Sequence, residues 1–169
     1  MRLALFASLA ALALGLASCA NYHLGTGSET RYATLHVAVV KSDVLLPQAV
    51  AIVTTQVREA FLKDGRVRLV DSASEADAVL TLTLEDYHRD TTVARADDTG
   101  LARRFDVVLQ ARAALVDQRS KQTVFANRPL KVTRGAFTDS GQLQSEYQLL
   151  PLLAEQLAER ALHATLDNW

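Results

Sequence analysis

The side chains that most often carry catalysis or bind metals are few in this 169-residue chain and lie far apart in the sequence. The chain has one cysteine, Cys19, and four histidines, which are His23, His36, His88 and His163. The histidines do not have the spacing of a metal-binding motif, and the chain has no glycine-rich phosphate loop or nucleophile elbow. The sequence therefore predicts a protein that is not an enzyme and that holds no metal ion or cofactor.

Two short patterns imitate catalytic or metal sites. His88–Asp90 matches the His-Arg-Asp triplet of a kinase catalytic loop, but Arg95 stands where that motif requires asparagine. Asp71, Glu75 and Asp77 could bind a cation, although turns and helix caps use the same residue types. Coincidence and local capping explain both patterns better than chemistry does.

The first 18 residues differ in composition from the rest of the chain. Arg2 is followed by the leucine- and alanine-rich segment Leu3–Ala17, which is typical of the charged and apolar regions of a signal peptide. The segment Leu16–Cys19 resembles the lipobox of bacterial lipoproteins, in which the cysteine is acylated and becomes the mature N-terminus. We expect residues 1–18 to be a signal peptide. An uncleaved membrane anchor is the alternative, since about 20 apolar residues span a bilayer, but the marginal length and the many alanines argue against it.

Cys19 is thereby predicted to carry a covalent lipid, palmitate included. Lipidation would remove a lone thiol that could form unwanted disulfides in an oxidising compartment, and several acyl chains on one residue give stable anchoring. Ala20 follows the cysteine, whereas aspartate at this position is associated with retention in the inner membrane. We expect an outer-membrane protein that is anchored in the inner leaflet, faces the periplasm and carries a polar tether over residues 19–33.

The overall composition fits a single folded domain over residues 34–169. The formal net charge is -1, and hydrophobic residues make up 49% of the chain. This balance argues against disorder and against a basic protein that binds nucleic acid, and one cysteine excludes a disulfide scaffold.

Basic residues are the group best suited to binding a ligand, because arginine forks bind phosphate and carboxylate groups. The candidates for an anion site are Arg89, Arg95, Arg103, Arg104, Lys131 and Arg134. Since they are up to 45 residues apart in sequence, only a folded sheet could gather them.

Four segments alternate apolar and polar residues as strands do. They begin near Leu35, Ala78, Phe105 and Val124. The last one contains Pro129, which lacks the donor for sheet pairing and predicts an edge strand or a bulge.

Two longer segments have helical periodicity. Pro47–Asp64 has proline early and Gly65 just past its end, and Val50, Val53, Val57 and Phe61 share a face. A C-terminal helix places Leu143, Tyr147, Leu150, Ala154, Leu157 and Ala161 on one face. Pro151 should kink this helix or start its main segment. A short strand is expected over 66–70, followed by one helical turn opened by Ser72 and Glu75.

The element order is β-α-β-β-β-α, apart from the short strand. We predict a two-layer α/β (α+β) sandwich with a mixed sheet of about four strands, two helices on one face and a rather polar open face. The Leu35 strand should pair in parallel with the Ala78 strand, and an antiparallel meander should follow.

Strand pairing predicts where the basic residues lie. If Leu84 faces Leu109, then Arg89 lies beside Arg104. If Leu109 faces Leu130, then Lys131 lies beside Val108 and Arg134 near Phe105. All six basic residues would then gather at one end of the sheet. Anion binding and an ordinary charged rim both remain open, since Asp90, Asp97, Asp98 and Asp106 lie near enough to neutralise much of the charge.

With these elements in place, the chain resembles the lipopolysaccharide-assembly lipoprotein family, LptE. The similarity includes the lipidated cysteine with Tyr22–Gly25 after it, Lys63–Gly65 followed by Ala76 and Asp77, and Leu150–Glu155 in the last helix. The resemblance implies a non-enzymatic partner of the LptD β-barrel that sits in the barrel lumen, assists barrel assembly and helps to deliver lipopolysaccharide. A lipoprotein adaptor of another envelope complex is the alternative.

Overall fold

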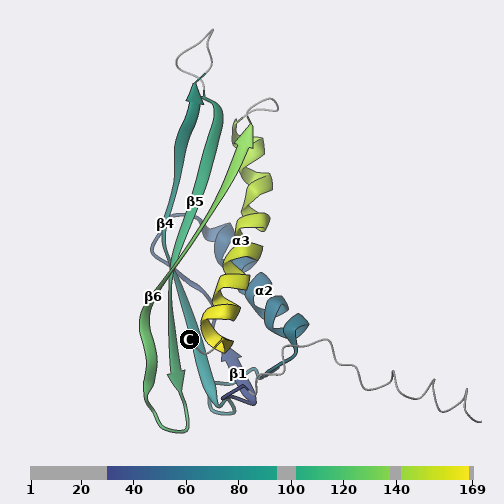
Figure 1. The fold of residues 1–169 in the computed structure, drawn as a ribbon, viewed down its shortest axis with the longest axis vertical. Coiled ribbons are helices and arrows are strands. Elements are labelled where there is room, and N and C mark those ends of the chain that lie inside the picture. Colours follow the sequence, from purple (N-terminus) through teal and green to yellow (C-terminus); the bar gives the residue numbers. More distant parts are fainter. Residues whose placement is uncertain (1–29, 95–101, 138–141, 168–169) are drawn as a thin grey trace, which may run out of the picture.

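The computed structural model describes residues 30–94, 102–137 and 142–167, which form one sheet covered by two helices (Figure 1). In chain order the elements are β1 (Thr34–Val37), β2 (Lys41–Ser42), α2 (Pro47–Asp64), β3 (Arg68–Leu69), β4 (Ala78–Ala94), β5 (Ala102–Asp117), β6 (Thr123–Phe137) and α3 (Gln142–Leu166). The predicted two-layer α+β fold is confirmed, and β2 is a short strand that the sequence did not indicate.

The sheet has the order β3-β1-β4-β5-β6, with β2 also paired to β4. β1 pairs in parallel with β4, where Leu35 lies opposite Ala78, and β4, β5 and β6 form an antiparallel meander. Both pairings follow the prediction. The last position of β6 in the sheet order also confirms the edge strand that Pro129 indicated.

Both helices cover the same face of the sheet (Figure 1). α2 has the expected bounds because Pro47 stands in its first turn, and Gly65 ends it in the left-handed conformation at φ 74°. α3 continues through Pro151, so this proline does not start the main helical segment. Within the described part of the chain, neither helix combines the length and the apolarity needed to cross a membrane.

The helices and the sheet bury one continuous core. Alternate residues of β4 and β5 point into it, among them Leu82 and Leu109, and Phe61 of α2 and Leu157 of α3 meet them from the helical layer. Strand alternation and helical periodicity predicted most of these positions because each element has one apolar face.

Three local expectations were wrong. Tyr147 is 66% exposed rather than part of the core face of α3, and Val50 is only half-buried. The segment after Ser72 forms a turn instead of a helical turn, because the Ser72 hydroxyl accepts the backbone N–H of Ser74 at 3.2 Å. A serine side chain bonded two residues ahead is the alternative to a helix cap.

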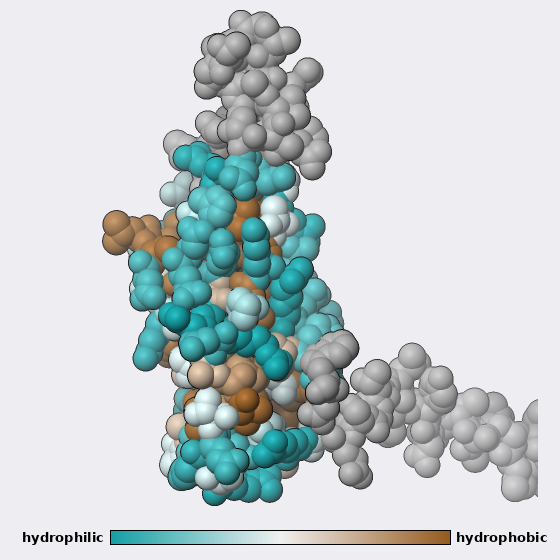
Figure 2. Space-filling view, turned by 60° about the vertical axis from the view of Figure 1, so that its left-hand side comes forward, coloured by the Kyte–Doolittle hydropathy of each residue, from teal (hydrophilic) through white to brown (hydrophobic). Residues whose placement is uncertain are grey.

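The opposite face of the sheet has no helix over it (Figure 1). Half-buried threonines, Thr81 and Thr83, lie on the lower part of this face, and Asp86, His88 and Asp90 follow higher up β4. In the view that brings this side of the molecule forward, most side chains are hydrophilic and an apolar area lies lower down (Figure 2). The open face is therefore rather polar, as predicted.

Candidate functional site

The upper end of the sheet, formed by β4, β5 and β6, has a different register from the one expected. A β-bulge in β4 lies between Leu84 and Asp86, so that Leu84 faces Ala111 and Tyr87 faces Leu109. Leu109 in turn faces Val132 instead of Leu130. The predicted pairs were wrong by two residues at Leu84 and at Leu109, a displacement that keeps the same side chains on the core face and is therefore invisible in the apolar alternation. The bulge after Leu84 adds one further residue to β4, and irregularities between Ala113 and Val116 shift the pairing of β5 with β6.

The corrected register places two of the candidate arginines on either side of one residue. Arg89 of β4 and Arg134 of β6 are both Cα partners of Val107 in β5. Val107 is fully buried on the helical side, so Arg89 and Arg134 belong to that same side. Two strand spacings separate their Cα atoms, which is roughly 10 Å. Two long guanidinium side chains at this separation can reach one anion placed between them.

Arg134 carries a polar atom that lacks a partner. The residue is half-buried, and its Nε–H is shielded from water and forms no hydrogen bond within the described part of the chain. A buried donor without an acceptor costs about 1–3 kcal/mol. A phosphate or carboxylate oxygen at this point would satisfy it. Arg89, one strand pair away, is exposed and can meet the same ligand from the solvent side.

The other four basic candidates do not join this pair in the described structure. Lys131 faces Gln110 rather than Val108 and is exposed on the helix-free face. Arg104 pairs with Val93 rather than with Arg89, and the side chains of Arg103 and Arg104 lie outside the described part. Arg95 lies wholly outside it. Of the three candidates whose side chains are described, Arg89 and Arg134 lie on the helical side and Lys131 on the helix-free face.

An acidic group lies on the helix-free face, of which the sequence indicated Asp90 and Asp106 but not Asp86 and its contact with His88. The Asp86 carboxylate lies 2.7 Å from His88 Nδ1 and accepts Gln110 Nε2–H at 3.0 Å, while Asp90 lies 3.5 Å from His88 Nε2. Asp106 is the Cα partner of Asp90 on the same face. These carboxylates occupy strand positions on the face opposite to that of Arg89 and Arg134. The alternate spacing of Asp86, His88 and Asp90 could have revealed the division.

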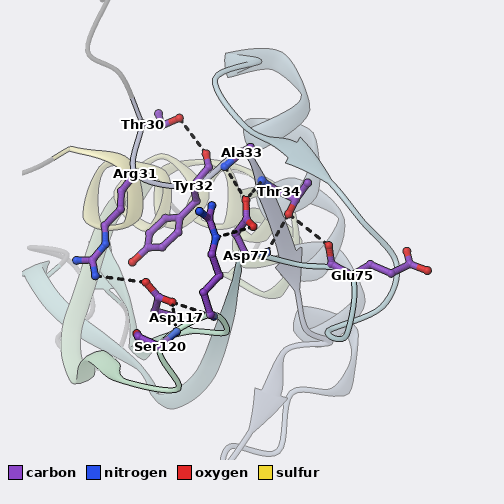
Figure 3. Close-up of polar contacts among 10 residues, drawn as sticks. Thr30, Arg31, Tyr32, Ala33, Thr34, Glu75, Asp77, Asp117 and Ser120 are labelled. Atoms are coloured by element: carbon purple, nitrogen blue, oxygen red, sulfur yellow. Dashed lines mark hydrogen bonds and ion pairs between the residues drawn. The ribbon is translucent and has the colours of Figure 1, made fainter.

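The lower end of the sheet holds a second polar cluster, where the chain enters the fold (Figure 3). The Asp77 carboxylate accepts the backbone N–H groups of Ala33 and Thr34, both at 2.9 Å, and Arg119 Nε–H at 2.9 Å. The hydrogen bond from Arg119, then that from Thr34, lowers the pKa of Asp77 to about 2. Asp77 is thus a structural residue that holds the start of β1.

Asp117 forms hydrogen bonds that hold the segment leading into β1. Its carboxylate accepts the backbone N–H groups of Ser120 at 2.9 Å and Arg119 at 3.0 Å, and Arg31 Nη2–H at 3.3 Å. The bond from Ser120 is the main cause that holds the pKa of Asp117 below its usual range. Tyr32 is buried between these groups, and burial raises the pKa of its phenol. Residues 31–34 are thereby held against the base of the sheet.

Metal binding finds no support in the parts of the chain that are described. No group of three or more histidine, cysteine or acidic side chains is arranged there to hold a metal ion. Of the acidic trio considered above, Asp77 is taken by the backbone and Arg119, and Asp71 pairs with Arg58 at 3.1 Å.

Solved structures with this fold share little sequence with the chain. A protein of Xanthomonas campestris is 15% identical, with a TM-score of 0.56, over 76% of this chain and 81% of that one. A lipoprotein B of Nitrosomonas europaea is 13% identical, with a TM-score of 0.55, over 86% and 90%. A minor lipoprotein of Acinetobacter baumannii is 15% identical, with a TM-score of 0.51, over 79% and 90%. At these identities the likeness concerns the fold alone.

Sequence comparisons identify the family. No curated protein sequence matches the chain. The model of the family LptE, described as lipopolysaccharide-assembly, matches residues 32–165, from the buried Tyr32 to the last turn of α3. Because this match covers most of the chain and every described helix and strand, the chain belongs to the LptE lipopolysaccharide-assembly family.

Proposed function

We propose that this protein is an outer-membrane lipoprotein that binds lipopolysaccharide through Arg89 and Arg134 and acts as the partner of an LptD-like β-barrel. The observation that carries the proposal is the placement of two arginines on either side of Val107, in a chain that matches the LptE family model. The protein has no enzymatic role in this proposal and contributes binding surfaces only.

The upper end of the sheet has the charge and the donors that a phosphorylated lipid requires. Arg134 supplies a buried N–H without an acceptor, and Arg89 supplies an exposed guanidinium nearby. Hydrogen bonds between arginine and phosphate are charge-assisted and often bidentate. The lipid A phosphates of lipopolysaccharide offer such acceptors.

The helix-free face fits the inside of a barrel. Outer-membrane barrels have polar interiors, and the exposed face of this sheet presents Asp86, His88, Lys131 and the threonines of β4. We propose that this face contacts the lumen while Cys19 holds the protein in the inner leaflet. The lipid on Cys19 is supported by the lipobox-like segment Leu16–Cys19.

Ligand binding is tested with purified lipopolysaccharide and the full chain in detergent. Arg89→Gln with Arg134→Gln should weaken binding by at least about tenfold, since each lost charge-assisted bond contributes about 1.5–3 kcal/mol. Arg112→Gln is the matched control, because Arg112 is another sheet arginine that pairs with Glu85 at 2.8 Å. Equal affinities of the double variant and the wild type would refute the ligand site.

The barrel partnership is tested separately. A tagged full chain, extracted in mild detergent, should co-purify with a large β-barrel of the lipopolysaccharide export system. Recovery with the components of a secretion or cell-wall complex would instead support a lipoprotein adaptor of another envelope assembly. Recovery of the protein alone would count against both assignments.

A further inference from the structure

The last strand of the sheet has one edge that no described strand covers. β6 pairs with β5 from Arg104↔Phe137 to Val116↔Thr123, and the sheet order ends with β6. An edge strand presents unpaired backbone N–H and C=O groups that can bind another extended chain.

Pro129 indicates which residues of β6 direct their peptide groups outward. Proline has no N–H, and it is tolerated in a sheet where its nitrogen faces away from the neighbouring strand. Pro129 is the partner of Arg112 in a continuous ladder, so its nitrogen faces the open edge. Peptide groups alternate in direction along an antiparallel strand. Lys131, Thr133 and Gly135 therefore present their N–H and C=O groups at that edge.

The same three residues have side-chain positions on the helix-free face and are open to solvent. Lys131, Thr133 and Gly135 are all exposed, whereas Leu130, Val132 and Ala136 between and beside them are buried. Gly135 has no side chain, so another backbone can approach it closely. The accessible segment from Lys131 to Gly135 is long enough for a short added strand.

The charge of β6 determines which occupant fits. The segment Thr123–Phe137 contains three basic residues, Arg128, Lys131 and Arg134, and no acidic residue. Arg128 is already occupied, because its Nη1–H donates to the carbonyl oxygen of Ala164 at 2.7 Å. Lys131 is the exposed cation at the open edge. A second copy of β6 would bring like charges together, which destabilises strand pairs, whereas carboxylates would be attracted.

We propose that the open edge of β6, from Lys131 to Gly135, binds an extended acidic segment of a partner protein as an additional strand. The backbone groups of Lys131, Thr133 and Gly135 supply the hydrogen bonds, and the Lys131 ammonium selects carboxylates on the incoming strand. The edge uses backbone groups of β6, whereas the proposed ligand site uses the side chains of Arg89 and Arg134, so this proposal does not depend on lipopolysaccharide binding.

The probe is a synthetic ten-residue peptide of alternating glutamate and valine, with a lysine-valine peptide as its charge control. We expect the full chain in detergent to bind the acidic peptide at least about tenfold more tightly than the basic one. Amide hydrogen exchange should slow at Lys131, Thr133 and Gly135 when the acidic peptide is bound. Equal affinity for both peptides, or unchanged exchange at these three amides, would overturn the proposal.

Two variants of Thr133 distinguish the contribution of its backbone N–H to peptide binding from that of its side chain. Thr133→Pro removes one outward N–H at a position equivalent to Pro129 and should abolish peptide binding, whereas Thr133→Ala keeps the N–H and should bind as the wild type does. Lys131→Gln should lose the preference for the acidic peptide even if Thr133→Pro fails to fold. Slower exchange at the β6 amides as protein concentration rises, without peptide, would assign the edge to a second copy and contradict the proposal.

Discussion

The two ends of the sheet use polar residues in opposite ways. At the lower end, Asp77 and Asp117 each accept several hydrogen bonds and hold residues 31–34 in place. At the upper end, Arg134 is half-buried with a donor that has no acceptor in the described structure. The two lower carboxylates are satisfied within the fold, which suits anchoring, although the buried Tyr32 hydroxyl beside them has no partner in the described structure. At the upper end the group without a partner is a charged donor, Arg134 Nε–H, which suits an anionic ligand.

The position of the lower end near the N-terminus gives this difference a functional meaning. The described chain begins at Thr30, whose hydroxyl donates to the carbonyl oxygen of Tyr32 at 2.9 Å. In our proposal the lipidated segment from Cys19 leads to this lower end, and lipopolysaccharide binds at the upper end. The predictions that follow test this division, beginning with the largest effect.

Loss of the lipid should detach the protein completely. Cys19→Ala should abolish palmitate labelling and release the protein from the membrane fraction, because the cysteine is the only predicted attachment site. Labelling and fractionation of cells that express the variant provide the measurement. A full-length product that stays in the membrane would instead favour an uncleaved anchor over residues 1–18.

Removing the Asp77 carboxylate should destabilise the fold. Asp77→Ala leaves the Ala33 and Thr34 donors and Arg119 without their acceptor, so we expect a loss of about 2 kcal/mol in the free energy of unfolding. Urea denaturation measures it. The control is Asp71→Ala, because the Asp71 side chain is 97% exposed and forms one ion pair; its cost should stay below about 0.5 kcal/mol. Equal losses of stability in the two variants would mean that the hydrogen bonds of Asp77 do not stabilise the lower end.

The lower end should also make stability sensitive to acid. The pKa of Asp77 is about 2 in the fold against 3.8 as a reference, so its contribution is present above pH 3.8 and is lost as the pH falls towards 2. Asp117 acts in the same direction. Unfolding measured between pH 5 and 2 should therefore show a smaller pH dependence in Asp77→Asn than in the wild type. Identical curves would contradict this assignment.

Removing an arginine charge at the upper end should reduce the free energy of unfolding less than removing one near the lower end. Arg134→Met removes an unsatisfied donor, so the free energy of unfolding should change by less than about 0.5 kcal/mol. Arg66→Met is the control, since Arg66 is 15% exposed and pairs with Asp64 at 2.8 Å and Asp167 at 3.0 Å. The control should lose more stability in thermal unfolding. A larger loss for Arg134→Met would make Arg134 a structural residue.

Local patterns predicted the elements of this fold well. Pro47 and Gly65 gave both ends of α2, and Pro129 gave the edge position of β6. These residues act on their own backbone, through a missing donor or an unusual φ, so one sequence position carries the information. The exposure of Tyr147 was not predictable, because helical periodicity cannot tell how far along α3 the core extends.

The candidate site was only partly predictable. The basic residues of the upper end were identified, but the register at Leu84 is displaced by two residues and the bulge after it adds one more, so Arg89 faces Val107 instead of Arg104. The lower cluster was missed because Asp77 meets Ala33 and Thr34 across more than 40 residues of sequence. Contacts of that range depend on the completed sheet, and neither alternation nor spacing encodes them.

Hydrogen exchange of the full chain, with and without lipopolysaccharide, tests the division between the two ends most directly. We predict slower amide exchange around Arg89 and Arg134 when lipopolysaccharide is bound, with no change at residues 31–34 or around Asp117. Slower exchange at the lower end, with none around Arg89 and Arg134, would contradict the account.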